Sequence, residues 1–168
     1  DLLAGIERPT SRAGRVVALL PGSRAQEVRA LLPAFLGAAA LLAARFPDAR
    51  FLLPVPAEGL AAEIDGAVAR CGLAIERVPG GAAAWAGADV VLAASGTAVL
   101  EAAILDVPCV AAYRVSWLTA FVAKRMLRVR HVTLPNIVAG RGIVPELLQG
   151  EARAERLAEE AGRLLAEP

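Results

Sequence analysis

Cysteine, histidine, lysine and aromatic residues are scarce in this chain of 168 residues. There are two cysteines and one histidine, the single lysine is Lys124, and aromatic residues make up 4% of the sequence. Cys71 and Cys109 lie far apart in apolar surroundings without metal-ligand spacing, which favours structural thiols in a reduced, cytoplasmic setting. The net charge of +1 and the lack of aromatic platforms for stacking bases exclude a general nucleic-acid-binding protein.

Long apolar runs and several ligand-binding motifs are also missing. The longest uncharged apolar stretch, residues 31–44, contains Pro33 and is too short to span a bilayer, and no signal peptide is recognisable. No G-x-G-x-x-G follows the first expected strand, no Gly-Lys-Ser/Thr occurs, and no carboxylate cluster follows a strand to hold magnesium. We therefore expect no transmembrane helix, no metal and no cofactor. The chain starts at Asp1 without a methionine, and we expect it to be part of a longer protein.

Hydrophobic residues are abundant, at 57%, and form apolar runs that alternate with longer helical patterns. This alternation is typical of repeated βα units. Strands are predicted over residues 15–20, 50–55, 74–78, 88–93 and 108–113, and helices over residues 25–45, 58–70, 97–105, 116–128 and 152–166. The order predicts one α/β domain over residues 1–168, with a doubly wound, mostly parallel, Rossmann-like sheet. Ligands of such sheets bind beyond the carboxyl ends of the strands, so a site is expected in the loops that follow strands.

The segment LPGSRAQEV, residues 20–28, directly follows the first predicted strand. Gly22 permits a tight turn, Ser23 is a typical helix N-cap and Gln26 would complete a capping box, so capping alone explains this part. It does not explain Arg24 at the first helical position, because a cation is unfavourable at the positive end of a helix unless an anion lies between them. Plain capping and a bound phosphate therefore remain two open interpretations.

The segment AASGTAVLEAA, residues 93–103, follows the fourth predicted strand. Ser95, Gly96 and Thr97 form a short turn into a helix, so their backbone N–H groups and hydroxyls would converge on one point, as in a phosphate site. Glu101 lies one turn further along the same face, where a carboxylate can accept hydrogen bonds from two adjacent ribose hydroxyls. The alternative is that Ser95 caps the helix and Glu101 is solvated. The apolar neighbours of Glu101 favour the nucleotide.

A third segment, LPNIVAGRGIVPELLQG, covers residues 134–150. Its polar side chains that could face a ligand are Asn136, Arg141, Glu146 and Gln149. Locally the pattern predicts a loop and then a short helix, with Pro145 in its first turn and Gly150 just past its end. This segment alone does not define a function.

Together, the three segments resemble the C-terminal half of the lipid-A-disaccharide synthase family, inverting glycosyltransferases of the GT-B class. The matching stretches are LLPGSRAQEV, ASGTAVLEAAILDVPCVAAYR and VTLPNIVAGRGIVPELLQ, and the resemblance covers nearly the whole chain from about Arg15. LPNIVAGR with PELLQ distinguishes this family, whereas the Ser-Gly-Thr to Glu element is shared by several nucleotide-sugar enzymes. Gly142 departs from the family, which typically carries Glu after AGR.

The resemblance implies a reaction. UDP-2,3-diacylglucosamine would donate its sugar to 2,3-diacylglucosamine 1-phosphate without a metal, giving a β-1,6-linked disaccharide phosphate and UDP. Arg24 is the expected catalytic residue, because its charge would stabilise the departing β-phosphate. The residues expected to bind the UDP-sugar, several of them by family analogy alone, are Gly22, Ser23, Arg24, Ser95, Gly96, Thr97, Glu101, Arg114, Asn136, Arg141, Glu146 and Gln149.

The resemblance also implies parts that this chain lacks. In the family an N-terminal half binds the acceptor and supplies an aspartate as general base, and the extreme C-terminus exchanges between subunits of a homodimer. We expect both regions to be absent here, so that the chain alone would be inactive. His131 is either a base or, more simply, a packed or surface histidine. A cytoplasmic protein, peripheral on the inner face of the inner membrane, is implied.

Two further interpretations stay open. The expected helix over residues 116–131 carries an apolar stripe and clustered arginines, so it fits either an anionic membrane surface or the core of the domain. The function could also be that of another UDP-sugar enzyme, a muramyl-pathway N-acetylglucosaminyltransferase or a UDP-sugar epimerase, although LPNIVAGR counts against both. A non-catalytic UDP-sugar-binding module is the alternative from a different class.

Overall fold

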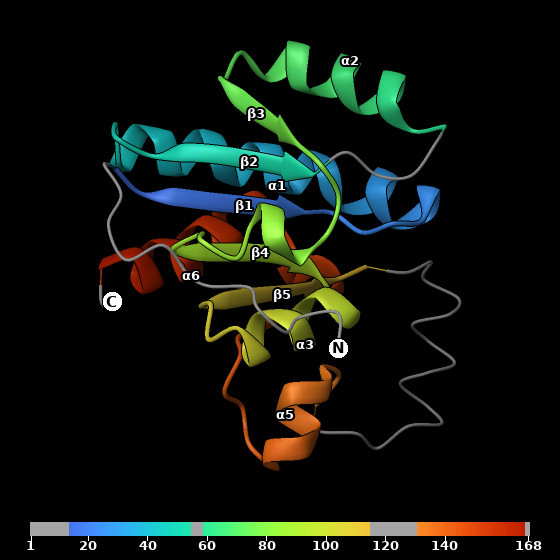
Figure 1. Ribbon diagram of the computed structural model, residues 1–168, viewed down its shortest axis with the longest axis vertical. Coiled ribbons are helices and arrows are strands. Elements are labelled where there is room, and N and C mark those ends of the chain that lie inside the picture. Colours follow the sequence, from blue (N-terminus) through green and yellow to red (C-terminus); the bar gives the residue numbers. More distant parts are fainter. Residues whose placement is uncertain (1–13, 55–58, 115–130, 167–168) are drawn as a thin grey trace.

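The computed structural model describes residues 14–54, 59–114 and 131–166, and the predicted helix 116–128 lies outside them (Figure 1). The strands are β1 (Val16–Leu20), β2 (Arg50–Pro54), β3 (Ile75–Val78), β4 (Val90–Ala94), β5 (Cys109–Tyr113) and β6 (Glu146–Leu148). The α-helices are α1 (Ala25–Arg45), α2 (Ala61–Cys71), α3 (Thr97–Ile104), α5 (Leu134–Ala139) and α6 (Ala154–Ala166), and the 3-10 helices are η1 (Ala82–Ala84) and η2 (Gln149–Glu151).

The six strands form one parallel sheet in the order β3-β2-β1-β4-β5-β6. The chain moves outward from β1 to β3 and then crosses back to place β4 on the other side of β1. Both β1 and β4 are runs of Val, Leu and Ala that are buried along their whole length, as expected for strands covered on both faces. The strand order reverses between β1 and β4, so the loops after these two strands meet at the edge where α/β sheets bind ligands.

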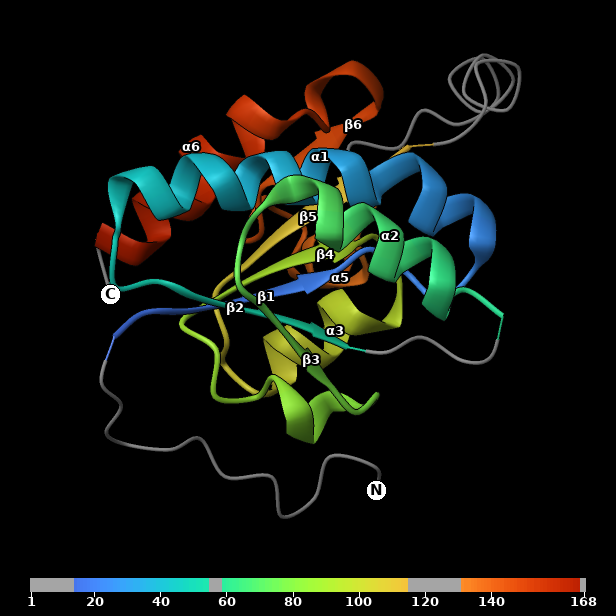
Figure 2. The ribbon, with the colours of Figure 1, turned by 90° about the horizontal axis from the view of Figure 1, so that it is seen from above.

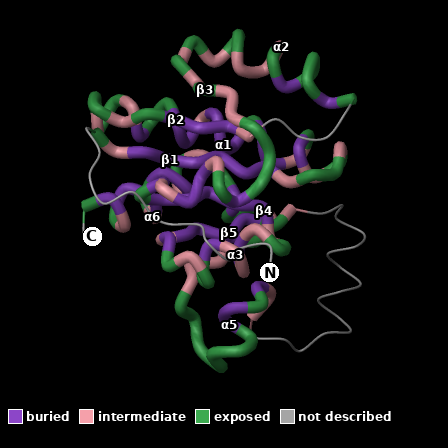
Figure 3. Tube along the Cα trace, in the orientation of Figure 1, coloured by how far each residue is buried: buried purple, intermediate pink, exposed green. Residues whose placement is uncertain are grey.

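Helices cover both faces of the sheet (Figure 2). Alternate residues of β1 point into two separate cores: Val17 and Leu19 pack in the core that α1, α2 and α6 cover, and Val16 and Ala18 pack on the side of α3 and η1. Figure 3 shows the buried residues concentrated in the strands and the inward faces of the helices. The doubly wound α/β architecture predicted from the sequence is confirmed.

Among the described helices, α1 is the longest, and it is long and apolar enough to cross a membrane by length and composition alone. In the structure it packs against the sheet and α6, with Val28, Phe35 and Leu42 among its buried side chains. The core helix of a soluble protein can have the same length and composition, and α1 has the contacts of a core helix.

The third segment differs most from its prediction. Residues 134–139, expected as a loop, form α5, which ends at Gly140 in the left-handed conformation. The short helix expected from Pro145 is wrong: residues 146–148 form the edge strand β6, whose register pairs Glu146 with Ala111. Gly150 does not follow a helix but lies within η2. Proline suits the start of an edge strand as well as the first turn of a helix, and the Pro145 carbonyl here accepts a hydrogen bond from the Ala111 N–H at 2.9 Å.

Candidate functional site

The turn between β1 and α1 forms one wall of the candidate site. Gly22 has φ +109°, and an added Cβ there would lie 2.5 Å from Oε2 of Glu27, so this turn requires glycine. The helix begins at Ala25, as the helical pattern predicted, and one residue later than the capping argument placed it. Arg24 is the N-cap, with extended backbone, so the predicted capping box of Ser23 and Gln26 is wrong.

Glu27 is the residue that contacts the N-cap in the structure. Its Oε1 accepts a hydrogen bond from Nη1 of Arg24 at 3.0 Å, and its Oε2 accepts one from the Arg24 backbone N–H at 3.4 Å. The Arg24 side chain is 82% exposed. Its charge therefore has a partner that the sequence argument did not consider, but it stays at the surface of the turn, where an anion could reach it.

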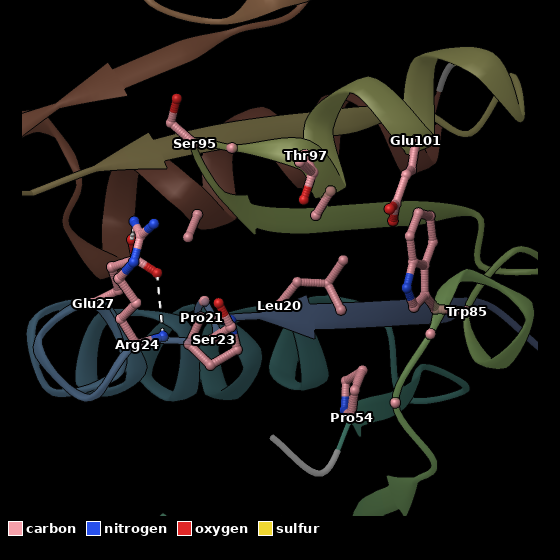
Figure 4. Close-up of a pocket in the computed structure, with 16 residues that line it drawn as sticks. Leu20, Pro21, Ser23, Arg24, Glu27, Pro54, Trp85, Ser95, Thr97 and Glu101 are labelled. Atoms are coloured by element: carbon pink, nitrogen blue, oxygen red, sulfur yellow. Dashed lines mark hydrogen bonds and ion pairs between the residues drawn. The ribbon is translucent and has the colours of Figure 1, made fainter. Parts of the chain in front are cut away.

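The loop between β4 and α3 forms the opposite wall. The Ser95 N–H donates to the Ala112 carbonyl at 2.7 Å and so continues the sheet, which removes it from the three N–H groups expected to converge on a phosphate. Gly96 is the N-cap of α3, and the N–H groups that open a helix have no partner within it. In Figure 4 the Thr97 hydroxyl and the Glu101 carboxylate point towards the end of β1, whereas the Ser95 hydroxyl points away from it.

A cavity of about 520 Å³ lies between these two walls (Figure 4). Its lining includes all seven residues of the first two segments that were predicted as site residues: Gly22, Ser23, Arg24, Ser95, Gly96, Thr97 and Glu101. The amino ends of α1 and α3 both border it, so their helix dipoles place positive potential in the same space. Such a cavity can bind an anionic ligand that is large enough to reach from Arg24 to Glu101.

The far end of this cavity is lined by residues that the sequence argument missed. Pro54 at the end of β2, Gly80 and Gly81 after β3, and Trp85 after η1 complete the wall. Trp85 is 3% exposed and lines the same cavity as Glu101 (Figure 4). No local motif marks it, because it follows a stretch of glycines and alanines. Glu27 was detectable, since it stands three residues after Arg24, on the same side of a helix.

A second cavity of about 370 Å³ shares Arg24, Glu27 and Ser95 with the first and extends to Arg114 at the end of β5. The Arg114 guanidinium donates to three main-chain carbonyls, those of Ala30 at 3.2 Å, Ala152 at 3.0 Å and Gln149 at 3.5 Å. These contacts tie the end of β5 to α1 and η2. The backbone carbonyl of Gln149 thus belongs to the scaffold, while a ligand contact of its side chain stays a prediction.

Asn136 and Glu146 form a hydrogen-bonded network outside both cavities. Asn136 is 1% exposed, and its Nδ2 donates to the Val144 carbonyl and to Oε1 of Glu146, each at 2.8 Å. Its Oδ1 accepts from the N–H groups of Ile143 at 2.7 Å and Val144 at 2.8 Å. Both amide hydrogens and both lone pairs are therefore used within the protein, and the predicted contact of Asn136 with a sugar donor stays a prediction. Its observed role is to fix the loop before β6.

The Glu146 carboxylate accepts hydrogen bonds from the N–H groups of Val132 and Thr133, from the Thr133 hydroxyl and from Asn136. Burial, the largest single effect, raises the pKa of Glu146, but the hydrogen bonds from Thr133, Val132 and Asn136 together outweigh it. The pKa is therefore lowered from its ordinary value. Glu146 is held as a charged carboxylate, and its predicted contact with the donor stays a prediction.

Three other residues singled out from the sequence lie near this network. Arg141 is exposed in the turn after α5, and His131 is half-buried. Gly142 has room for a side chain, because an added Cβ would lie 3.8 Å from Cε1 of His131, an ordinary contact. The backbone therefore accommodates the Cβ that the glutamate usual in the family would place here. The roles considered for Arg141 and His131 stay predictions.

The fold is that of the Rossmann-like domain shared by GT-B glycosyltransferases and UDP-sugar epimerases. A UDP-GlcNAc 2-epimerase from Neisseria meningitidis, solved with UDP-GlcNAc bound, superimposes with a TM-score of 0.61 at 13% identity, over 94% of this chain and 37% of that one. The spinosyn rhamnosyltransferase SpnG, solved with thymidine diphosphate, gives a TM-score of 0.58 at 16% identity, over 93% of this chain and 38% of the other.

The sequence assigns the chain more narrowly. Residues 8–168 match the family described as lipid-A-disaccharide synthetase, and the chain belongs to this family. It is 46% identical over 159 residues to a lipid-A-disaccharide synthase from Anaeromyxobacter dehalogenans, covering 94% of this chain and 41% of that relative. The chain spans about two fifths of the length of the curated relatives that it matches. The family assignment decides against the muramyl-pathway transferase and the epimerase that the sequence left as alternatives.

Proposed function

We propose that this chain is the UDP-sugar-binding half of a lipid-A-disaccharide synthase. The complete enzyme would transfer 2,3-diacylglucosamine from UDP to 2,3-diacylglucosamine 1-phosphate, with inversion and without a metal. The observation that carries the proposal is one cavity at the switch point of the sheet, lined together by Arg24, Thr97 and Glu101. Family membership supports the sugar donor, and the cavity supplies groups suited to a nucleoside diphosphate.

The cavity lining offers a suitable group to each part of a UDP ligand: the diphosphate, the ribose and the uracil ring. The diphosphate would lie between Arg24 and the first N–H groups of α3, where a guanidinium and a helix N-terminus both favour negative charge. The ribose would reach the Glu101 carboxylate, one turn further along α3, which accepts hydrogen bonds from its two hydroxyls. The remaining space, towards Gly81 and Trp85, would hold the uracil ring.

The same groups would promote the reaction. The acceptor's 6-hydroxyl oxygen forms the new bond to C1 of the donor sugar while the bond from C1 to the β-phosphate oxygen breaks. The electron pair of the broken bond goes to the β-phosphate, and the proton of the hydroxyl goes to a base outside this chain. The extra charge on UDP would be stabilised by Arg24 and by the N–H groups at the start of α3, which are already oriented before the reaction.

Three properties of the complete protein are part of this proposal. Its acceptor half and general base would lie in the remaining three fifths of the relatives' length, and the chain alone would bind the donor without turning it over. A homodimer would form in the full-length enzyme. It would work at the cytoplasmic, inner face of the inner membrane as a peripheral protein, because both substrates carry acyl chains.

Calorimetric titration of UDP into the 168-residue chain tests the binding proposal. UDP should bind, and Glu101→Gln should weaken UDP binding by about tenfold or more, because a hydrogen bond to a charged group contributes about 1.5–3 kcal/mol. With 2′,3′-dideoxy-UDP as the matched ligand, the chain and the Glu101→Gln variant should bind equally. A lack of UDP binding at millimolar concentration, or an equal loss with both nucleotides, would contradict the assignment.

A further inference from the structure

A second carboxylate lines the proposed diphosphate site, and the proposed function does not explain it. Glu27 and Glu101 are the two acidic side chains in the described lining of the larger cavity, and Glu27 also lines the smaller one. Glu101 suits the ribose. Glu27 stands at the opposite end, beside Arg24, where a negative charge repels a bound diphosphate.

The fold holds Glu27 in this unfavourable place. Its carboxylate bends back over the turn after β1 to accept the hydrogen bonds from the Arg24 guanidinium and backbone N–H, at 3.0 Å and 3.4 Å (Figure 4). Gly22 leaves the space for it, since an added Cβ would lie 2.5 Å from Oε2 and 2.8 Å from Cβ of Glu27. The position of the carboxylate therefore depends on a glycine that the turn itself requires.

The ion pair between Arg24 and Glu27 can be broken at a low cost in free energy. The side chains of Arg24 and Glu27 are 82% and 31% exposed, and exposed ion pairs of this kind contribute little free energy in water. A diphosphate offers the guanidinium a stronger, charge-assisted hydrogen-bonding partner than a single carboxylate does. Arg24 can thus exchange Glu27 for the ligand by a rotation of its own side chain.

We propose that Glu27 is a positioning residue that competes with the ligand's diphosphate for the Arg24 guanidinium. This inference rests on the proposed function. With the site empty, Glu27 holds Arg24 at the mouth of the cavity. When the UDP-sugar binds, Arg24 turns to the diphosphate, and after the transfer Glu27 takes the guanidinium back. Glu27 thereby lowers the affinity of the site for UDP and favours the release of UDP.

Glu27→Gln tests the competition, because glutamine keeps the size of the side chain and removes the charge. UDP should bind to this variant about threefold to tenfold more tightly, the range expected when an exposed ion pair and a nearby repulsion are both removed. Glu63→Gln is the matched control, since Glu63 forms an exposed 3.0 Å pair with Arg29 away from the cavity. Its UDP affinity should equal that of the unchanged chain.

A double-mutant cycle and a second ligand show whether the effect passes through Arg24. In an Arg24→Ala background, Glu27→Gln should improve UDP binding by a smaller factor than in the unchanged chain, because the contested guanidinium is gone and only the direct repulsion between the carboxylate and the diphosphate is left to remove. Uridine, which has no phosphate, should bind equally to all variants. The same gain in the Arg24→Ala background, or an equal gain with uridine, would overturn the competition mechanism.

The outcomes also separate this inference from the proposed function. If UDP binds to the unchanged chain but Glu27→Gln leaves its affinity equal or lower, the competition is wrong while the UDP site stands. If neither UDP nor uridine binds to the unchanged chain, the nucleotide site is wrong, and the role of Glu27 fails with it. Thermal unfolding of each variant verifies that the fold is retained.

Discussion

Replacement of Asn136 by alanine should lower the stability of the domain without a direct effect on ligand binding. The Asn136 side chain is 1% exposed and makes four hydrogen bonds, to the main chain at Ile143 and Val144 and to the Glu146 carboxylate. Alanine removes all four hydrogen bonds, and no other protein group takes the place of the amide as a partner of these main-chain groups and of the Glu146 carboxylate. The loop between α5 and β6 then loses the side chain that fixes it.

The size of the loss follows from where these partners lie. Val144 and Glu146 are half-buried, so water can hydrogen-bond to some of the groups that lose their partner. Each lost hydrogen bond is therefore expected to cost about 0.5–1 kcal/mol rather than the full penalty of a buried, unpaired group. The free energy of unfolding should therefore fall by about 2–4 kcal/mol. For a domain of this size the melting temperature should drop by roughly 5–15 °C.

Urea unfolding of the chain and of Asn136→Ala measures this difference. Asn136→Asp is the isosteric control: it keeps the two acceptor bonds but places an oxygen where the amide donated to Glu146, so it should also destabilise. The refuting result is an Asn136→Ala variant with an unfolding free energy within about 0.5 kcal/mol of the unchanged chain and clearly weaker UDP binding. Asn136 would then contact the ligand, as the sequence suggested, rather than fix the loop.

Two further substitutions test the hydrogen-bonded network of Asn136 and Glu146 and the proposed diphosphate position at the start of α3. Because the folded pKa of Glu146 lies below its ordinary value of 4.5, its contribution to stability is present above pH 4.5 and is lost as the pH falls through the folded pKa. The difference in unfolding free energy between the chain and Glu146→Gln should thus shrink below pH 4.5, and a difference that grows there would contradict the network. Gly96 is extended and an added Cβ would meet nothing within 4 Å, so Gly96→Ala should leave the melting temperature unchanged. It should nevertheless weaken UDP binding in a titration, because the methyl group occupies space at the proposed diphosphate position, and unchanged affinity would place the diphosphate elsewhere.

The position of the site could be predicted from the sequence because it depends on topology. Apolar runs alternating with helical patterns define a parallel sheet, and polar turns that follow strands must then lie at its carboxyl edge. Gly22 and Thr97 are 75 residues apart in the sequence, yet this rule places them on one cavity. The cavity-lining residues of both turns could therefore be predicted without any knowledge of their contacts.

The details of the turn after β1 could not be predicted in the same way. Capping preferences favour Ser23 as the N-cap, but the backbone at Gly22 turns with φ +109° and carries the chain one residue further before the helix begins. That shift makes Glu27, not Gln26, the third helical residue. A one-residue difference decides which side chain faces Arg24, and local propensity does not resolve it.

The third segment was harder because its structure depends on partners elsewhere in the chain. The strand β6 has three residues and no alternating pattern, and it exists through its pairing with β5. Asn136 and Glu146 have the polar side chains that a ligand site would use, and the sequence cannot show that they satisfy each other. Only the contacts distinguish a side chain that binds a substrate from one that closes a loop.

The turn after β1 links the stability of the fold to the electrostatics of the cavity. A side chain at residue 22 would strain a backbone that L-residues rarely adopt, at about 1–3 kcal/mol, and would collide with Glu27. The displaced carboxylate would release Arg24, so a substitution at Gly22 would also change the charge offered to a bound diphosphate. The chain carries a net charge of only +1, so the attraction for the proposed diphosphate would come from such local placement: two helix N-termini and a guanidinium whose availability a neighbouring carboxylate is proposed to control.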